Sequence, residues 1–541
     1  MEAHSGLGSV GIIGSGTAGL LTALALKERD PRMDVTIVAS SGIPVIGVGE
    51  ATTPVLPPFL FGYLGIDPHR FEREVQPTLK LGIRFEWGLP DGWFNYAFGD
   101  GDLSDAMSHD GHLRRYSATS QMMDAGKAPL VRVGGKLHSL LRETRLALHL
   151  DNVRLVRFLE QRAREVGVRF VDATVHEVRR ASQGPSGDLV DQLETSAGPL
   201  SFDLYVDCTG FRSLLMNGAL HSPFIDYSSS LMTDRAITAV RRYDAPNGPK
   251  TPPPYTTART MNAGWCWTIP MRDELHHGYV FASKYLKEDD AHRELEKVYP
   301  GCDDFKVVRF RSGRREHFIR GNVVALGNSY AFVEPLESTA IHMVVIAISK
   351  LLAELGAPSG ARASSLPRGP HGETRLSLAE THARGQARPF VSAHRQAELN
   401  AQMGAHWDWL RWFLAVHYRF NRRVDSPFWH DVHLTTDWSG LEATHKDFLA
   451  NGPLSARDPN TPGTPPAPKL AGDIVFGPRG FDIVMLGQGV VPKTLPRRTS
   501  ATEWRELAIM RERMIELALP HAEALGRFGE DRALLDGLVH D

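Results

Sequence analysis

The first forty residues place apolar runs and helical periodicity in an order that predicts a strand, a helix and a second strand. Residues 9–13 and 35–39 are short apolar runs, and residues 20–28 carry apolar side chains at helical spacing. Short continuous apolar runs are typical of strands buried on both faces in a parallel sheet. We therefore expect a βαβ unit at the start of the chain.

Later segments of the chain show the same alternation of helix and buried strand. Residues 148–173 predict a helix followed by a strand, and residues 204–207 and 323–326 predict further buried strands. The segment after residue 339 predicts a helix, because these apolar residues fall on one face: Ile341, Val344, Val345, Ile348, Leu351 and Leu352. Strands alternating with helices indicate an α/β fold.

Residues 78–87 alternate strictly between two faces and predict one strand that is buried on one side. Lys80, Arg84 and Glu86 share the polar face. From this pattern alone, Lys80 is a solvated residue on the wet side of the strand.

The chain has 541 residues, which is more than one hydrophobic core usually supports. Segments 356–370 and 457–468 are rich in proline and glycine and predict linkers, and the sequence around and beyond them is mostly helical. We expect an α/β module with inserted sheet segments over residues 1–355 and a mostly helical lobe that covers the substrate over residues 372–541.

Charge and cysteine content argue against several classes of partner. A formal net charge of −2 provides no electrostatic basis for binding nucleic acid or an anionic membrane. The three cysteines, Cys208, Cys266 and Cys302, form no C-x-x-C pair, which favours a reduced chain without a structural zinc or other metal. No signal peptide or membrane span is apparent, so we expect a cytoplasmic protein.

Residues 14–19, G-S-G-T-A-G, match the G-x-G-x-x-G motif between the first strand and the first helix. Gly14 permits the tight turn, Gly16 lets a pyrophosphate approach the backbone, and Gly19 lets helix and strand pack closely. The phosphates then lie at the helix N-terminus. A tight turn without a nucleotide is the alternative reading.

Two features qualify the nucleotide prediction. The acidic residue that usually binds the ribose at the end of the second strand is replaced by Ala39, with Ser40 as a weaker hydrogen-bonding substitute. No second G-x-G-x-x-G occurs, so reducing equivalents are expected to arrive from outside.

Further motifs follow the glycine motif in this order along the chain: I-G-V-G-E-A-T (46–52), Lys80, D-C-T-G-F-R-S (207–213), G-W-C-W-T-I-P (264–270) and F-V-E-P-L-E-S-T (332–339). As a set they resemble the flavin-dependent halogenases, specifically the tryptophan-halogenase branch. The resemblance extends from the first strand to about residue 429.

The resemblance implies a Rossmann-like FAD-binding module of the flavin monooxygenase type with a mostly helical C-terminal lobe. In this family a separate flavin reductase supplies reduced FAD, and oxygen and chloride or bromide give hypohalous acid. The acid passes through an internal tunnel to a lysine beside an electron-rich aromatic substrate. Such enzymes act in the biosynthesis of natural products, including antibiotics.

The resemblance also implies a set of functional residues. Lys80 and Glu337 correspond to the catalytic pair: both orient the oxidant, and Glu337 accepts the proton from the ring. Backbone N–H groups of Thr339 and Ala340 bind the halide, with Ala340 in place of the usual glycine. The barrier and tunnel residues are Trp265, Trp267, Pro270 and Ser338. The FAD-binding residues are Gly14, Gly16, Thr17, Ala18, Gly19, Ser40, Gly49, Glu50, Ala51, Asp207, Gly327, Asn328 and Ile341.

Simpler interpretations stand beside these roles. Trp265 and Trp267 also fit a packed core strand, and Glu337 also fits a carboxylate that complements a helix dipole. Glu334 is the second candidate for the functional glutamate. Lys80 acts either as an ammonium that hydrogen-bonds hypohalous acid or as an amine that forms a haloamine.

The C-terminal region bears on the substrate. Free-tryptophan halogenases hold the amino acid with a tyrosine pair and a glutamate, and residues 459–481 show no such cluster. The indole of a tryptophan within a peptide or another larger molecule is therefore the expected substrate. The aromatic-rich helix over residues 406–420 is expected to pack in the core. Alternatives are a halogenase of free tryptophan, indole or phenol, an aromatic hydroxylase, and a non-catalytic FAD- or peptide-binding protein. The sequence does not decide between a monomer and a homodimer.

Overall fold

The computed structural model describes residues 8–42, 49–134, 136–140, 145–181, 188–245, 248–355, 388–457 and 476–525. The linker expected at 356–370 and nearly all of the one at 457–468 lie outside these residues, as does the expected boundary between residues 355 and 372.

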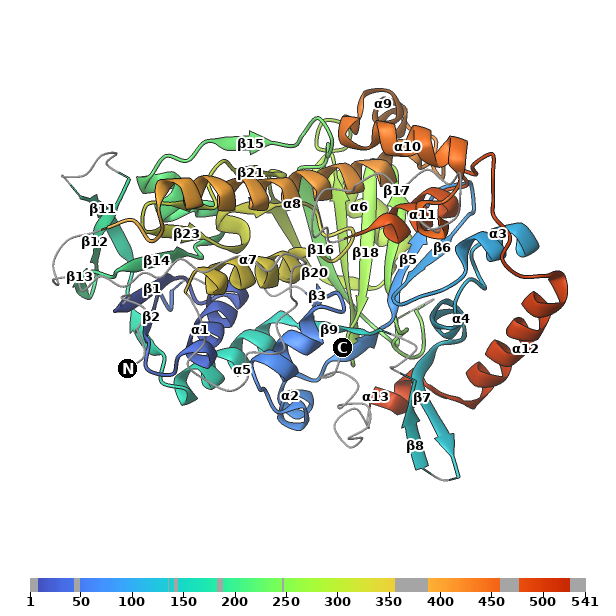
Figure 1. Cartoon of the computed structure of the whole chain (residues 1–541), viewed down its shortest axis with the longest axis horizontal. Coiled ribbons are helices and arrows are strands. Elements are labelled where there is room, and N and C mark those ends of the chain that lie inside the picture. Colours follow the sequence, from blue (N-terminus) through green and yellow to red (C-terminus); the bar gives the residue numbers. More distant parts are fainter. Residues whose placement is uncertain are drawn as a thin grey trace.

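A six-stranded sheet at the N-terminal side carries the predicted βαβ unit (Figure 1). All its strands are parallel except the edge strand β22. Their order is β10 (Arg169–Asp172), β2 (Asp34–Ala39), β1 (Ser9–Ile13), β14 (Leu204–Asp207), β23 (Val323–Ala325) and β22 (Ile319–Arg320). The three helices associated with it are α1 (Thr17–Arg29), α5 (Asn152–Glu165) and α7 (Ala340–Glu354). The predicted elements of this sheet are thus present, with ends that differ by a few residues.

A second sheet has seven strands, all antiparallel to their neighbours except at the β17–β5 pair. Their order is β20 (Cys302–Arg309), β16 (Arg235–Arg242), β19 (Glu274–Phe281), β18 (Gly264–Pro270), β17 (Thr256–Met261), β5 (Gly82–Glu86) and β6 (Phe94–Ala97). The central strand β18 holds the two-tryptophan motif and is buried along its whole length.

Four smaller sheets complete the strands. They are β3 (Gly49–Ala51), β9 (Ala147–Asp151) and β4 (Thr78–Lys80); β11 (Val175–Arg180), β12 (Val190–Thr195) and β13 (Gly198–Leu200); β15 (Phe224–Asp226), β21 (Gly313–Arg315) and β24 (Ala331–Phe332); and β25 (Ala518–Pro520), β7 (Lys127–Val133) and β8 (Lys136–Ser139). The other helices before residue 356 are α2 (Pro68–Val75), α3 (Leu103–Asp110), α4 (Ala118–Ala125) and α6 (Glu288–Val298), with 3₁₀ or π turns at Pro58–Tyr63, Gly210–Arg212, Leu214–Ala219 and Gly327–Ser329.

The C-terminal part is mostly helical, as expected. It contains α8 (Ala393–Phe420), α9 (Pro427–Thr435), α10 (Ser439–Asn451), a 3₁₀ turn at Leu454–Ala456, α11 (Pro478–Gly487), α12 (Ala501–Leu517) and α13 (His521–Leu525). The short strand β25 is an addition that the sequence did not predict, and it pairs with β7. Figure 1 shows α8 running along one side of the molecule past both large sheets.

Side-chain contacts of α8 tie the two large sheets together. Near its start, Asn400 accepts the backbone N–H of Ile319 in β22. Near its end, the carbonyl of His417 accepts the indole N–H of Trp87, the residue after β5. The helix therefore fixes elements that lie far apart in the sequence.

The prediction of one continuous strand over residues 78–87 was wrong. The chain forms β4, breaks at Leu81 and then forms β5, and the two strands belong to different sheets. The Leu81 N–H donates to the carbonyl of Pro254. The break turns Lys80 into the interior, where it is 0% exposed, so the wet-face reading from the pattern fails.

We predict that Gly278→Ala destabilises the protein. Gly278 faces Trp267 across the β18–β19 pair, and an added Cβ would lie 1.8 Å from the indole. Overpacking of this kind costs about 1–3 kcal/mol. Urea unfolding measures the change, with Gly218→Ala as a control because its Cβ would meet only the Ser213 carbonyl, at 3.9 Å. Equal stability of the two variants would contradict the packing described here.

Candidate active site

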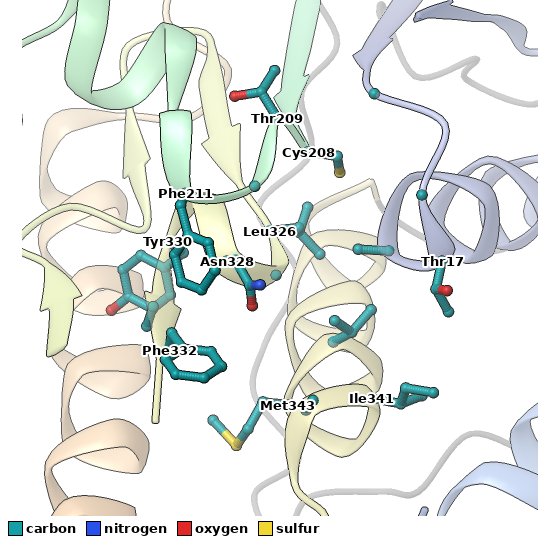
Figure 2. A pocket seen from close by; sticks show the side chains of 18 of the residues that line it. Thr17, Cys208, Thr209, Phe211, Leu326, Asn328, Tyr330, Phe332, Ile341 and Met343 are labelled. Carbon is teal, nitrogen blue, oxygen red and sulfur yellow. The ribbon is translucent and has the colours of Figure 1, made fainter. Parts of the chain in front are cut away.

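A cavity of about 520 Å³ lies beside the carboxyl ends of β1, β2 and β14 and the start of α7. Figure 2 shows Thr17, Cys208, Asn328 and Ile341 among its lining residues. Ligands of open parallel sheets bind at such carboxyl ends. The predicted cofactor residues that line the cavity are Gly14, Gly16, Thr17, Ala18, Ser40, Gly49, Glu50, Ala51, Gly327, Asn328 and Ile341.

The glycines of the first motif have three different steric environments. Gly14 has φ +112°, and a Cβ there would lie 2.4 Å from the Cys208 carbonyl oxygen. A Cβ at Gly19 would lie 2.2 Å from the carbonyl oxygen of Gly14, so Gly19 packs helix on strand and does not line the cavity. At Gly16 a Cβ would meet no atom within 4 Å. The open space at Gly16 is what a pyrophosphate approaching the backbone requires.

Two helices begin at the cavity. α1 follows Gly16 and α7 follows Thr339, and neither N-cap residue makes a side-chain capping hydrogen bond. The first N–H groups of a helix have no partners within the helix and favour anions. Thr339 and Ala340, the predicted halide residues, both line the cavity, which places an anion-binding helix end there.

Asp207 has a different surrounding from the other predicted cofactor residues. It is fully buried, is absent from the cavity wall, and accepts hydrogen bonds from the backbone N–H groups of Leu215 (2.8 Å) and Met216 (2.9 Å). Thr209 also donates to it through its backbone N–H and its hydroxyl. The carboxylate therefore organises the turn after β14.

The ribose edge carries a carboxylate that the sequence did not reveal. Asp172 of β10 pairs in register with Ala39, where the usual acid is missing, and accepts the Ser41 N–H at 2.9 Å. A second carboxyl, Glu50, lines the cavity, and burial raises its pKa to about 7. A share of molecules thus carries a neutral Glu50 at neutral pH.

The two indoles of β18 lie on the same face of the strand, with ring centroids 5.9 Å apart. Trp267 forms part of the cavity wall, whereas Trp265 does not. The Trp265 indole N–H donates to Glu334 at 3.1 Å and is 1% exposed. One indole thus faces the cavity and the other is anchored behind it.

Glu334 accepts hydrogen bonds from three side chains: Trp265, Thr233 and Tyr418. Burial raises the pKa of this carboxyl, and the three donors lower it again. Both oxygens of Glu334 are thus engaged by structural donors, and the residue is 0% exposed.

Lys80 is fully buried. Its Nζ donates to the carbonyl of Thr52 at 2.8 Å and to the hydroxyl of Ser338 at 2.7 Å, and it lies 5.4 Å from the centroid of the Phe98 ring. Burial lowers its pKa from 10.5 to about 7, although Glu337 opposes the shift. Ammonium and amine forms are therefore both accessible near neutral pH.

Ser338 links Lys80 to the cavity. It lines the cavity wall and has φ +58°, an uncommon conformation for a residue other than glycine. Such backbone conformations cost about 1–3 kcal/mol and are held by surrounding contacts. The strained backbone sets the Ser338 hydroxyl between the cavity and the buried lysine.

Glu337 is 1% exposed and lies 2.8 Å from Nε2 of His417, which is 0% exposed. His417 comes from α8, the helix that the sequence assigned to core packing alone. The sequence did not place His417 or Tyr418 among the site residues, although a histidine and a tyrosine within an otherwise apolar helical segment could have indicated buried polar contacts.

Other predicted residues lie outside the cavity wall. Lys80, Glu337, Trp265 and Pro270 are all absent from it, and the Pro270 carbonyl accepts the hydroxyl of Thr78 at 2.6 Å. Among the described residues no cluster of histidine, cysteine or acidic side chains could hold a metal ion. In the same part of the chain, no helix has the length and apolarity needed to cross a membrane.

Comparison with known proteins shows which family this architecture belongs to. The sequence profile of the tryptophan halogenase family matches residues 9–365 and 380–503. The chain belongs to the tryptophan halogenase family. It is therefore a flavin-dependent halogenase, an enzyme of the oxidoreductase class, and the resemblance read from the sequence is confirmed.

Individual relatives support this assignment. The tryptophan 7-halogenase RebH of Lentzea aerocolonigenes is 32% identical over 454 residues, which covers 77% of each protein. The solved structure of MibH, a "lathipeptide tryptophan 5-halogenase", has 41% identity and a TM-score of 0.85 and covers 99% of this chain and 96% of that one. The halogenase BrvH from Brevundimonas sp. BAL3 has 28% identity, a TM-score of 0.78 and coverage of 96% and 99%.

Membership establishes the general requirements of this halogenase. Flavin-dependent halogenases use FAD, a halide and an aromatic substrate, and they work with a separate flavin reductase. The fold expectation is confirmed as well, because the structural relatives share the mixed α/β architecture.

We predict that Lys80→Met stabilises this halogenase more at pH 6 than at pH 9. The folded pKa of Lys80 is depressed, so the unfolded chain binds more protons between pH 7 and 10.5 and wild-type stability rises with pH there. Burying the charged ammonium lowers the free energy of unfolding by its full amount below pH 7, and this loss disappears as the pH approaches 10.5. The gain should shrink by about 2 kcal/mol between the two pH values in denaturant titrations. An equal gain at both would show that Lys80 titrates normally.

Proposed function

We propose that this halogenase attaches chlorine or bromine to the indole ring of a tryptophan held in a peptide or another large molecule, as a step in natural-product biosynthesis. In this enzyme Lys80 and Glu337 are the catalytic pair, and Trp265 and Trp267 form the barrier. The chain divides into an FAD-binding module over residues 1–355 and a lobe over residues 372–541 that covers the substrate.

The observation that carries the chemistry is the contact between Lys80 Nζ and the Ser338 hydroxyl, at 2.7 Å. Ser338 belongs to the wall of the nucleotide-sized cavity, whereas Lys80 is buried behind that wall. A small, polar oxidant made in the cavity would therefore meet a hydrogen-bonding serine and then a lysine. This arrangement supports transfer of hypohalous acid from the cavity to Lys80.

The cavity residues fit FAD. Gly16 leaves room for a pyrophosphate at the start of α1, and Ser40 lines the cavity. Asp172 is not part of the wall but pairs in register with Ala39, which is. When bound, reduced FAD with oxygen supplies the oxidising power that converts a halide into hypohalous acid. The N–H groups of Thr339 and Ala340 would hold the halide at the start of α7. Trp267 closes the side of the cavity toward the other indole, so that a ring-sized molecule is excluded.

The chain's own residues then perform the substitution. Lys80 donates a hydrogen bond to the hypohalous acid, or as an amine takes up the halogen, and so presents an electrophilic halogen to the ring. Glu337 accepts the proton that leaves the halogenated carbon. Both groups are dry, which strengthens their electrostatic effect on the reacting atoms.

Two observations favour a peptide over free tryptophan. The structure of MibH, a lathipeptide tryptophan halogenase, matches this chain with 41% identity and a TM-score of 0.85, against 26% and 0.79 for the tryptophan 6-halogenase SttH of Streptomyces toxytricini. The sequence over residues 459–481 carries no tyrosine pair or glutamate to anchor an amino acid, although most of that segment lies outside the described residues. A free-tryptophan or phenol halogenase remains the second candidate.

We predict that Lys80→Ala and Glu337→Gln lower halogenated product by about a hundredfold or more while flavin oxidation continues. Product is measured by the isotope pattern of chlorine or bromine after incubation with a flavin reductase, FAD, NADH and the halide. Lys27→Ala is the matched control, because Lys27 is also buried yet bonds only to the carbonyls of Pro31 and Met33. Full yield from Lys80→Ala would refute the assigned mechanism, and a hydroxylated product from wild type would favour the hydroxylase.

We also predict a higher kcat/KM for N-acetyl-tryptophan amide and for tryptophan peptides than for L-tryptophan. Free tryptophan brings an ammonium and a carboxylate, and burying them unpaired costs several kcal/mol. Neutral amides avoid that cost in an apolar groove. All substrates are compared with one reductase and one halide, and a clear preference for L-tryptophan would contradict the peptide assignment.

A further inference from the structure

His417 and Glu337 form a hydrogen-bonded pair in which both ring nitrogens of the histidine contact oxygen atoms. Nε2 of the imidazole lies 2.8 Å from Oε1 of Glu337, and Nδ1 lies 2.9 Å from the carbonyl oxygen of Phe413, one turn earlier in α8. The two side chains are 0% and 1% exposed. Both ring nitrogens therefore face an oxygen in a dry environment.

The Phe413 carbonyl can only accept a hydrogen bond, so Nδ1 must carry a proton. An ionised Glu337 can also only accept, so Nε2 must carry a proton as well. With Glu337 ionised, a neutral imidazole satisfies only one of these contacts and leaves two lone pairs opposed at hydrogen-bond distance. A protonated Glu337 that donates to Nε2 would satisfy both, but a protonated carboxyl cannot act as the base. An imidazolium facing a carboxylate satisfies both contacts at once.

We propose that His417 is a positioning residue that works as a buried cation, holding Glu337 ionised and oriented as the base of the halogenation step. The inference rests on the proposed function of Glu337. It assigns a role to α8, the helix whose aromatic-rich sequence predicted core packing alone.

The physical need for such a partner follows from burial. Desolvation disfavours a buried carboxylate, as it does for Glu50, whose pKa burial raises to about 7. Four other titratable groups interact with the pair or with its partners. The charge of Glu337 affects Lys80 and Tyr96, the charge of His417 affects Glu334, and Tyr418 donates a hydrogen bond to Glu334. Lys80 has a pKa lowered to about 7, so it does not supply a full positive charge at neutral pH. An imidazolium supplies that charge at hydrogen-bond distance.

The assignment leaves a balanced proton-transfer step. Oε1 of Glu337 accepts from His417, which leaves Oε2 for the substrate. When the ring carbon bonded to halogen loses its hydrogen, the C–H electron pair returns to the ring and the proton passes to Oε2. The halogenated ring, a cation whose reacting carbon still carries its hydrogen, is a strong acid, so a carboxylate weakened by an imidazolium contact still accepts its proton.

The test compares His417→Gln and His417→Phe with wild type. Gln keeps a neutral N–H donor, whereas Phe keeps only the ring shape. Asn400→Ala is the matched control, since it removes hydrogen bonds to the backbone N–H groups of Phe318 and Ile319 from the same helix without touching the glutamates. FAD affinity and thermal unfolding establish that each variant is folded. The probe is N-acetyl-tryptophan amide with protium or deuterium on the indole ring.

Both His417 variants should lower kcat at least about tenfold, a part of the hundredfold or more that general-base help contributes. The acid limb of the pH–kcat profile should move to higher pH, because Glu337 loses the cation that keeps it ionised. A primary deuterium isotope effect should appear, because proton loss from the ring becomes slow. Asn400→Ala should leave the acid limb and the isotope effect as in wild type.

An unchanged acid limb and no isotope effect in both folded His417 variants would overturn the inference while the proposed function stands. If wild type does not halogenate any indole probe, the proposed function fails. Nitrogen-15 NMR of imidazole-labelled full-length protein, with His417→Gln to assign the signal, tests the proton independently of turnover. Two protonated ring nitrogens at neutral pH support the assignment, and one protonated nitrogen overturns it.

Discussion

Two neighbouring residues of one helix hold the loop on which the whole site depends. His417 contacts Glu337 and Tyr418 contacts Glu334, and both glutamates belong to residues 333–339, the glutamate loop before α7. Through Glu334 the loop anchors the indole of Trp265, and through Ser338 it reaches Lys80. If α8 moved away, the residues proposed as barrier, catalytic pair and halide site would all lose these contacts.

The contacts of His417 and Tyr418 with the glutamate loop hold because the polar groups that make them are buried and hydrogen-bonded to one another. Buried carboxylates and hydroxyls cost several kcal/mol when they lack partners, so each of these contacts has a single favourable arrangement. Glu334 has three donors and is thereby removed from the chemistry, while Glu337 has one described side-chain partner and keeps an oxygen for the substrate. Two similar glutamates in one short loop thus differ in role because their surroundings differ.

The glutamate loop also joins the two halves of the reaction. Its C-terminal end, Ser338 and Thr339, belongs to the wall of the cavity that fits FAD, and Lys80 lies directly behind Ser338. The strained backbone at Ser338 is the local cost of turning from the buried glutamate to the cavity within one residue. In the proposed mechanism, a few consecutive residues therefore separate generation of the oxidant from substitution of the ring.

By itself, the sequence determined most elements of the parallel sheet and the family. Apolar runs and the glycine motif predicted β1, α1 and β2, because buried strands and tight phosphate-binding turns allow few other residues. Ordered motifs also indicated the halogenase family and named Lys80 and Glu337. Only the structure decided that the strand breaks at Leu81, where the backbone meets the distant Pro254, and that Asp207 accepts hydrogen bonds from the turn that follows it. The same holds for Asp172 beside Ala39 and for His417 beside Glu337, residues separated by 133 and 80 positions in the chain. Periodicity reports which face of an element is buried, but it does not report which polar groups meet once the faces pack together.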